Sequence, residues 1–317
     1  MSEKLEQAVE REKTREADLL RGACDMHIHP NPSMFVRRYD DIEVARQYRD
    51  VGARAIVLKD HHTETACRAF LVRRVVPGID TFGAIVLNYA VGGLNSFAVD
   101  VAIRYGAKVV WMPTSDSKHH VTTYGGGGAT MKGRHTPPDG RPLWPGYRGL
   151  GGISLIKDNG ELVPEMEPIL KLIADARVVI ATGHISPRET ETLVREARRM
   201  GIDKIVITHP LEIVNIPVDK QVELAKLGAT MEYMWSDIGP YSYDLAPGLT
   251  LGHIVDAIKR VGPEHCIIST DAGQWWNPAP CECLRSVVRM LLEKKIPAED
   301  VEKMIKGNPL RLLGLSP

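Results

Sequence analysis

The chain has 317 residues, of which 40 are acidic and 40 are basic, and 44% are apolar. That length suits a single α/β barrel with a sizeable buried core. The balanced charge argues against a nucleic-acid partner, because binding to phosphates needs a basic excess. No apolar run approaches the roughly 18 residues of a membrane span. We therefore expect neither a nucleic-acid nor a membrane partner.

The N-terminus and the cysteines show no sign of secretion. Residues 1–21 are charged throughout and lack the apolar stretch of a signal peptide. The five cysteines are odd in number and scattered, unlike a disulfide framework. Cys281 and Cys283 form the one close pair, and they lack a second pair at zinc-finger spacing, so free thiols are expected. We therefore expect a cytoplasmic protein.

Strand and helix patterns alternate along the chain. A helical pattern at about 3–20 comes first, and we assign residues 1–22 to this N-terminal helix and residues 23–317 to a single domain. Apolar, β-branched runs predict strands at 24–29, 54–58, 82–88, 107–112, 177–182, 204–208, 229–233 and 266–269. Amphipathic patterns predict helices at 42–51, 64–76, 95–106, 165–176, 187–200, 218–227, 250–261 and 281–295.

Eight strands, each followed by a helix, predict an α/β fold with a parallel sheet covered by helices. Eight such units favour a closed (β/α)₈ barrel, the TIM barrel, over an open sheet. Residues 114–152 are rich in glycine and proline and predict a long loop after the fourth strand, and 152–163 predict a hairpin turning at 158–160. Loops of this length are often functional, so we expect a lid over the rim of the barrel.

Polar side chains occupy the end of the first strand. Asp25, His27 and His29 alternate with apolar residues, so they are expected to share one face of the strand. In a barrel that face is the interior, where branched apolar residues are the rule. Buried polar groups are costly unless something satisfies them, and a divalent cation would do so.

The same pattern follows three further strands. His184 comes after the fifth strand, His209 directly follows the sixth, and Asp271 follows the eighth. The C-terminal ends of barrel strands meet at one rim, which is where barrel active sites lie. Histidines and an aspartate on four strand ends therefore predict a metal site.

These residues resemble the amidohydrolase superfamily, with Asp25-x-His27-x-His29 on the first strand and the closing run from Gly307 to Leu315. The resemblance implies that His27, His29 and Asp271 bind one metal and that His184 and His209 bind a second. It further implies one or two divalent ions, zinc first with manganese or iron as alternatives, and a hydroxide between two metals as nucleophile. Asp271 would act as general base and then acid, and Asp25 would orient a ligand histidine.

The bridging ligand departs from the better-known members of that superfamily. They often place a carboxylated lysine or a glutamate on the fourth strand, but here that strand ends Trp111-Met-Pro113. Lys59, at the end of the second strand, is the best substitute, as a carboxylated lysine between two cations. The alternative is an ordinary amine that pairs with Asp25 or Asp60 or contacts substrate.

Further residues near the rim are candidates for substrate contact. His61 shares the face of Lys59 by alternation, and Glu232 ends the seventh strand. His119 and His120 follow the fourth strand and are candidates as extra ligands or substrate donors. The remaining candidates are Trp275, which follows Asp271, and Arg134 in the long loop, where a cationic group would clamp a carboxylate or phosphate.

The predicted function is hydrolysis of an amide, cyclic amide, ester or lactone of a small-molecule substrate. A metal-dependent decarboxylase of a small aromatic or enol acid is the first alternative, and a non-catalytic metal- or ligand-binding barrel is the second. Asp271 argues against the second, because a pure binding site needs no general base. We also expect a homo-oligomer, with the N-terminal helix as one element that would join a neighbouring subunit.

Overall fold

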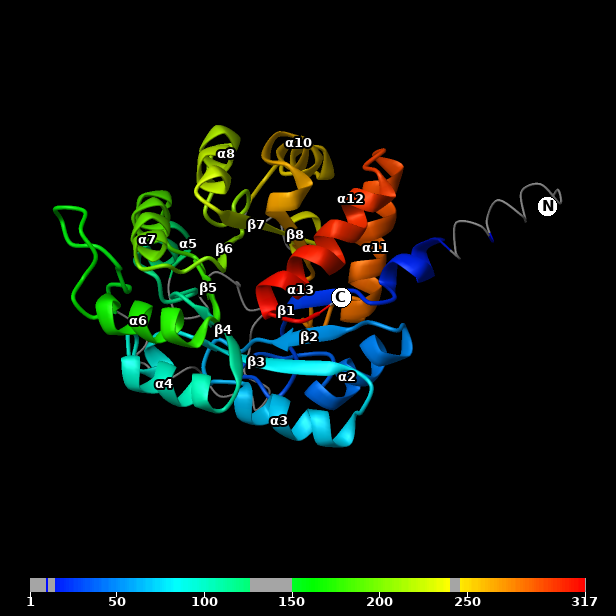
Figure 1. The fold of residues 1–317 in the computed structure, drawn as a ribbon, viewed down its shortest axis with the longest axis horizontal. Coiled ribbons are helices and arrows are strands. Elements are labelled where there is room, and N and C mark those ends of the chain that lie inside the picture. The colour runs from blue at the N-terminus through cyan, green and yellow to red at the C-terminus, as the bar shows by residue number, and fades with distance from the viewer. Residues whose placement is uncertain (1–9, 11–14, 126–149, 240–245, 317) are drawn as a thin grey trace.

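The structure, a computed structural model, describes residue 10 and residues 15–125, 150–239 and 246–316. Its central feature is an eight-stranded parallel sheet in the order β1 to β8, which curves into a barrel surrounded by helices (Figure 1). The strands are β1 Cys24–Ile28, β2 Ala55–Leu58, β3 Asp80–Val86, β4 Ala107–Trp111, β5 Val179–Ala181, β6 Ile205–Thr208, β7 Ala229–Met234 and β8 Cys266–Ser269. The predicted (β/α)₈ barrel is confirmed.

Helices follow the strands as the amphipathic patterns predict. They are α2 Asp41–Asp50, α3 Ala66–Val75, α4 Ser96–Arg104, α5 Lys118–Tyr124, α6 Met166–Ala176, α7 Pro187–Arg199, α8 Val218–Lys226, α10 Leu251–Val261, α11 Pro280–Glu293, α12 Ala298–Glu302 and α13 Asn308–Leu313. Short turns are η1 Tyr89–Val91, η4 Ser236–Ile238, η5 Pro263–His265 and the π-helical η6 Lys303–Gly307. None of the described helices is both long and apolar enough to cross a membrane.

The barrel closes between the ends of β1 and β8. Ile28 pairs with Ala272 in a parallel bridge, and the His29 amide donates to the Ala272 carbonyl at 2.8 Å. One step earlier, the Asp271 amide donates to the His27 carbonyl at 2.9 Å. This seam therefore sets Asp271 directly beside the two histidines of β1.

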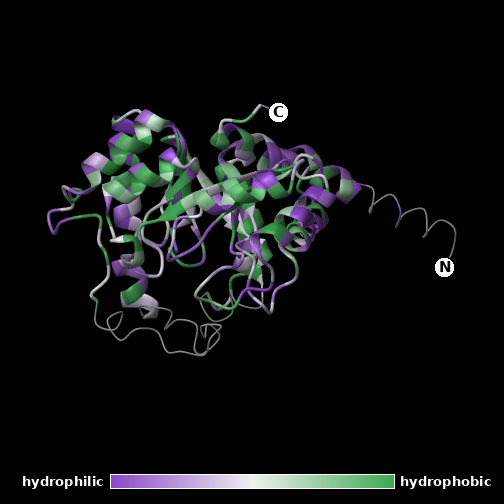
Figure 2. Cartoon of the chain, turned by 90° about the horizontal axis from the view of Figure 1, so that it is seen from below, coloured by the Kyte–Doolittle hydropathy of each residue, from purple (hydrophilic) through white to green (hydrophobic). Residues whose placement is uncertain are grey.

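Apolar side chains form two buried layers around the strands, and hydrophobic segments gather along the strands in Figure 2. The larger layer lies between strands and helices, and the smaller one fills the barrel. Leu310, Leu312 and Leu313 of α13 belong to the inner layer. Asn308 is the first residue of α13, and its side-chain amide donates to the Cys266 carbonyl at the start of β8. Helix α13 thus closes the end of the barrel where the strands begin.

β1 contains an irregularity that the sequence pattern does not predict. Asp25 pairs with Ile56 and Ile28 pairs with Leu58, so three steps along β1 match two steps along β2. One extra residue of this kind is a β-bulge, which shifts the alternation of side chains. Asp25 therefore points toward α2 in the helical layer, where the Tyr48 hydroxyl donates to it, and does not share the inward face of His27. The prediction that it does was wrong.

The insertion after β4 is partly helical. Residues 118–124 were expected in a loop but form α5. Ser117 is the N-cap of this helix, and its hydroxyl accepts from the His120 amide at 3.0 Å. The predicted hairpin is present, because Ile156 and Leu162 pair in an antiparallel bridge. The rest of the predicted lid, residues 126–149, lies outside the described residues.

The predicted N-terminal helix lies partly within the described residues. Residues 15–20 are helical, with Leu19 and Leu20 buried in the core. Glu16 accepts from both nitrogens of the Arg289 fork on α11, so this turn is anchored to the outside of the barrel.

Candidate metal centre

Three predicted ligands meet at the rim where β1 and β8 end. The Nε2 atoms of His27 and His29 lie 3.1 and 3.0 Å from the same atom, Oδ1 of Asp271. Both rings are buried, whereas 15% of the Asp271 side chain stays exposed. One ligand atom from each residue lies within 4.8 Å of the others, a spacing that donors around a single cation require.

The protonation of these residues suits a cation. Burial holds the pKa of His29 well below its usual range, so the ring is neutral and carries a lone pair. Burial alone would raise the pKa of Asp271, but its interactions with His27 and His29 hold that pKa well below its usual range. Neutral imidazole and ionised carboxylate are the forms that bind zinc, manganese or iron. The donor set therefore fits a divalent metal.

The backbone is strained at two of the predicted ligands. His209 and Asp271 have positive φ angles of 49° and 50°, which non-glycine residues adopt rarely. Such conformations cost about 1–3 kcal/mol each and persist where the surrounding structure imposes them, often at functional sites. Gly273 is required nearby, because a Cβ there would lie 1.9 Å from the His29 carbonyl oxygen. This close approach keeps Asp271 against His29.

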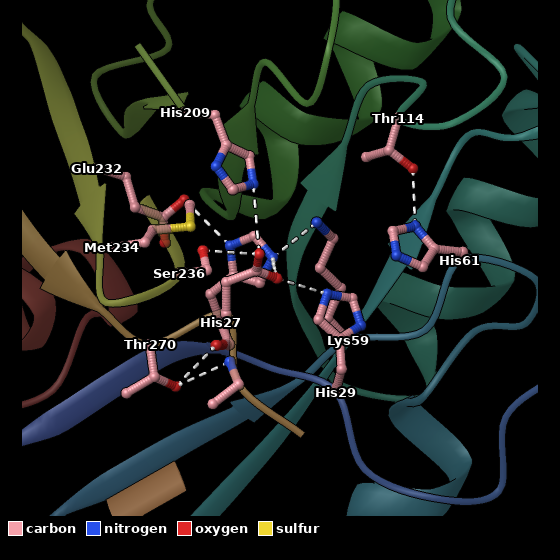
Figure 3. A network of polar contacts seen from close by, with 12 residues as sticks. His27, His29, Lys59, His61, Thr114, His209, Glu232, Met234, Ser236 and Thr270 are labelled. Atoms are coloured by element: carbon pink, nitrogen blue, oxygen red, sulfur yellow. Dashed lines mark hydrogen bonds and ion pairs between the residues drawn. The ribbon is translucent and has the colours of Figure 1, made fainter. Parts of the chain in front are cut away.

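Lys59 extends from the end of β2 into the same group, toward the ring of His27 (Figure 3). Its Nζ lies 2.8 Å from His27 Nε2 and 4.9 Å from the centroid of the Trp111 ring. Burial lowers the pKa of Lys59 to about 8, although Asp271 and Glu232 act in the opposite direction. The amine is therefore neutral more often than that of an exposed lysine.

Glu232, and not Asp25, contacts the ring of His27. His27 Nδ1 lies 3.4 Å from Glu232 Oε2, and Glu232 is only 1% exposed. Asp25 accepts instead from the His27 backbone amide at 3.1 Å and from the Tyr48 hydroxyl at 2.5 Å. Burial raises the pKa of Asp25 to about 6. The ring contact expected of Asp25 is thus made by Glu232, which the sequence placed among the substrate contacts.

His209, after β6, is oriented by two buried carboxylates that the sequence analysis did not identify. Its Nδ1 lies 3.1 Å from Asp237 and 3.2 Å from Glu212, and its Nε2 lies 3.7 Å from Asp271. Burial opposes a charged ring, but the hydrogen bonds to Asp237 and Glu212 raise the pKa of His209 to about 10. With Nδ1 donating to these acids, Nε2 faces the centre, and it must lose its proton before it can bind a cation.

His184, after β5, pairs with His120 of α5. Their Nδ1 atoms lie 3.1 Å apart, and both residues are buried. Ser117 connects the backbones of the two histidines, because its hydroxyl donates to the His184 carbonyl at 2.6 Å and accepts from the His120 amide. Burial lowers the pKa of His120 to about 3 and that of His184 well below its usual range. Two neutral rings in this contact must have opposite tautomers, one donating and one accepting.

The His120 contact gives a prediction about metal affinity. If His184 donates through Nδ1, its Nε2 keeps a lone pair for a cation, and His120→Leu should weaken metal binding by roughly 10–100-fold. His120→Asn places an amide oxygen near the Nδ1 position and should preserve most of the affinity. Metal titration with a competing chelator measures both, with His119→Leu on the same helix as control. Equal losses in the Leu and Asn variants would contradict the tautomer assignment.

Two other predicted substrate contacts, His61 and His119, differ in whether they reach the candidate ligands. His61 stacks on His29 with ring centroids 4.7 Å apart, and its Nδ1 lies 2.9 Å from the Thr114 hydroxyl. His119 Nε2 lies 3.2 Å from the Ile213 carbonyl, so it is its neighbour His120 that reaches the histidine cluster.

Of the two remaining predicted contacts, one is exposed and the other lies outside the described residues. Trp275 is 55% exposed, and its ring meets Trp276 edge-on at 5.7 Å. Arg134 lies outside the described residues. The structure therefore brings together the predicted metal ligands more closely than the predicted substrate contacts.

The fold is similar to solved structures of low sequence identity. A probable dipeptidase from Pseudomonas aeruginosa shares 14% identity at a TM-score of 0.63, over 96% of this chain and 98% of that one. Organophosphorus hydrolase from Deinococcus radiodurans shares 16% at 0.59, over 94% of each chain. An amidohydrolase from Pseudomonas aeruginosa shares 13% at 0.58, over 94% and 98%. These likenesses show the fold, a TIM barrel, which the alternating strand and helix patterns predicted.

Sequence comparison adds the family. No curated protein matches the chain. The model of a family of unknown function, DUF6282, matches residues 22–232, which include four predicted histidine ligands and Lys59 and end before Asp271. Since this match covers well over half of the 317 residues, the protein is a member of the DUF6282 family.

Proposed function

We propose that the protein is a metal-dependent hydrolase that cleaves an amide, cyclic amide, ester or lactone bond of a small molecule. The convergence of His27 Nε2 and His29 Nε2 on Asp271 Oδ1 carries the proposal, because it joins a donor set for a cation to a partly exposed carboxylate. The solved structures of similar fold include enzymes named for hydrolysis of different bonds, which supports the reaction class and leaves the bond open.

Each residue around the candidate metal centre has a separate role in the proposed reaction. A divalent cation held by His27, His29 and Asp271 would supply Lewis-acid activation of water. Asp271 accepts the proton of the attacking water and passes it to the leaving group. Ser236 donates to Asp271 Oδ2 at 2.9 Å and so fixes the orientation of this carboxylate. Glu232 holds the ring of His27 from behind.

A second cation would be held by His184 and His209, whose ring centroids lie 5.2 Å apart. We include Lys59 as the bridge between the two cations. Its neutral amine adds to carbon dioxide and loses one proton, which gives a carbamate with two oxygens and one negative charge. Such a group suits a position between cations, and the lowered pKa of Lys59 favours the reactive neutral amine.

Metal content tests the proposal directly. Protein purified without chelators is expected to carry one to two zinc, manganese or iron ions per chain, and His27→Ala should lower that number. The control is His253→Ala, which removes an exposed histidine on α10. Elemental analysis by mass spectrometry gives the count. Absence of transition metal, even after reconstitution, would refute a metal-dependent enzyme.

A substrate screen then separates the rival functions. Amides, lactones, phosphoesters and carboxylic acids should be tested with the metal-loaded protein. Two ions per chain with turnover of an amide or ester supports the hydrolase. A single ion with release of carbon dioxide from an acid would assign the decarboxylase, and tight metal binding without turnover of any class would assign a binding protein.

A further inference from the structure

Exposed hydrophobic side chains are concentrated on two helices. Across the part of the chain that the structure describes, eight large hydrophobic side chains are exposed, and six of them lie on α3 or at α4. They are Phe70 at 50%, Leu71 at 61%, Val75 at 51%, Phe97 at 85%, Val101 at 44% and Tyr105 at 53%. Single exposed apolar residues are normal, but a concentration of this kind marks an interaction site.

The exposed residues of α3 recur at the spacing that is typical of a helix face packed against another surface. Its exposed positions are 67, 70, 71, 74 and 75, and all but Arg74 are apolar or cysteine. Positions that recur at three- and four-residue intervals form one helical face. The opposite face packs Ala66, Ala69 and Val72 against the barrel. A helix that is apolar on both faces is typical of one covered on both sides.

Helix α4 continues the same surface. Phe97, Val101 and Tyr105 are spaced by four residues and so lie on one face, opposite the buried Val99 and Ala102. Both α3 and α4 contact β3, and they follow one another along the lower edge of the barrel in Figure 1. We call the six exposed residues of the two helices the α3–α4 face.

The size of the α3–α4 face fits the core of a dimer interface. With roughly 150–250 Å² for a large side chain, the six together expose on the order of 600 Å². That is the upper end for the largest patch on a monomer, about 300–600 Å². A standard interface buries about 800 Å² per partner. The apolar patch supplies most of this area, and polar residues around it would supply the rest.

The charges around the face favour an uncharged apolar partner. The Arg74 guanidinium lies over the Phe70 ring, 5.9 Å from its centroid. Arg104 pairs with Asp100, and Arg73 donates to the Thr81 carbonyl. The cations are thus engaged within the chain, and the whole chain has a net charge of zero, so two copies do not repel one another.

We propose that the α3–α4 face joins two copies of this chain in a symmetric dimer. A two-fold axis lets one apolar patch cover an identical one, which needs no second specialised surface. The face lies on the outer wall of the barrel, so this dimer leaves the rim with Asp271 open to substrate. It differs from assembly through the N-terminal helix, and it does not depend on the proposed hydrolase activity.

Molar mass in solution tests the dimer. Full-length protein measured by light scattering after size exclusion should show twice the chain mass of 35.1 kDa at micromolar concentration. The double variant Leu71→Asp/Phe97→Asp should be monomeric, with the same far-UV spectrum. Leu150→Asp changes an exposed leucine outside the face and should remain dimeric. A monomeric wild type, or a dimer that survives the double variant, would overturn the proposal.

Cys67 offers a second measurement, which reports on the contact through the reactivity of a native side chain. All five cysteines lie in described residues, and Cys67 is the exposed one. It belongs to the outer stripe of α3, so a soluble thiol reagent should modify it at least tenfold more slowly in the wild type than in the double variant. Equal modification rates would show that α3 is not covered in the wild type and would contradict the proposed interface. Flotation of a monomeric wild type with neutral phosphatidylcholine vesicles would assign the face to lipid and also contradict the dimer.

Discussion

Replacing Asp271 with asparagine is expected to lower hydrolysis at least a hundredfold while leaving part of the bound metal in place. Asparagine keeps one oxygen near His27 and His29, so the cation retains a ligand. It cannot accept a proton, and loss of a general base costs roughly 10²–10⁴-fold in rate. The measurement is kcat/KM on the substrate found by screening, together with the metal count.

The control for this variant is Asp256→Asn, which changes an exposed acid on α10. It should leave both the rate and the metal count unchanged. Near-normal turnover by Asp271→Asn would remove Asp271 from proton transfer. Loss of all metal in the same variant would reduce its role to that of a ligand.

Replacing Lys59 with alanine is expected to remove about one metal ion per chain and most of the activity. Lys59 Nζ is 2.8 Å from His27 Nε2, so its loss opens a gap beside a predicted ligand. A short carboxylic acid such as acetate should restore part of the metal binding, because it supplies the two oxygens of the lost carbamate. Elemental analysis with and without acetate gives the result.

Carbon-13 NMR distinguishes a carbamate from an ordinary amine at Lys59. Protein equilibrated with labelled bicarbonate should show one carbamate signal that is missing in Lys59→Ala. Lys59→Arg is the matched control, because it keeps a cation but cannot form the carbamate, and it should behave like the alanine variant. Full metal occupancy in Lys59→Arg would show that the side chain acts as a cation and that the bridge lies elsewhere.

The fold and the convergence of the candidate ligands were predictable because they depend on local patterns. Apolar runs predict each strand, and a polar residue directly after such a run predicts a position at the rim, as for His184 and His209. The parallel order of the strands then brings these residues together without further information. The positions of His27 and His29 at the rim follow from the same reasoning.

Other features depend on the tertiary structure and leave little local signal. The bulge in β1 results from pairing with β2, so the orientation of Asp25 toward Tyr48 cannot be inferred from alternation. Helix α5 is short and contains β-branched threonines, which have low helix propensity, so its sequence predicts a loop and does not distinguish His120 from His119. Apolar residues on α3 look the same in sequence whether they face the barrel or solvent.

The seam between β1 and β8 has a consequence for how the protein is made. Thr270 donates to Asp25 across a sequence separation of 245 residues, and the candidate ligands His27, His29 and Asp271 span the same seam. Contacts this distant in sequence form late, after the intervening chain has been ordered. During synthesis, His27 and His29 leave the ribosome long before Asp271 is translated. The nascent chain therefore cannot complete the proposed metal site until almost all of the barrel has been synthesised, and metal capture there should coincide with the closing of the barrel.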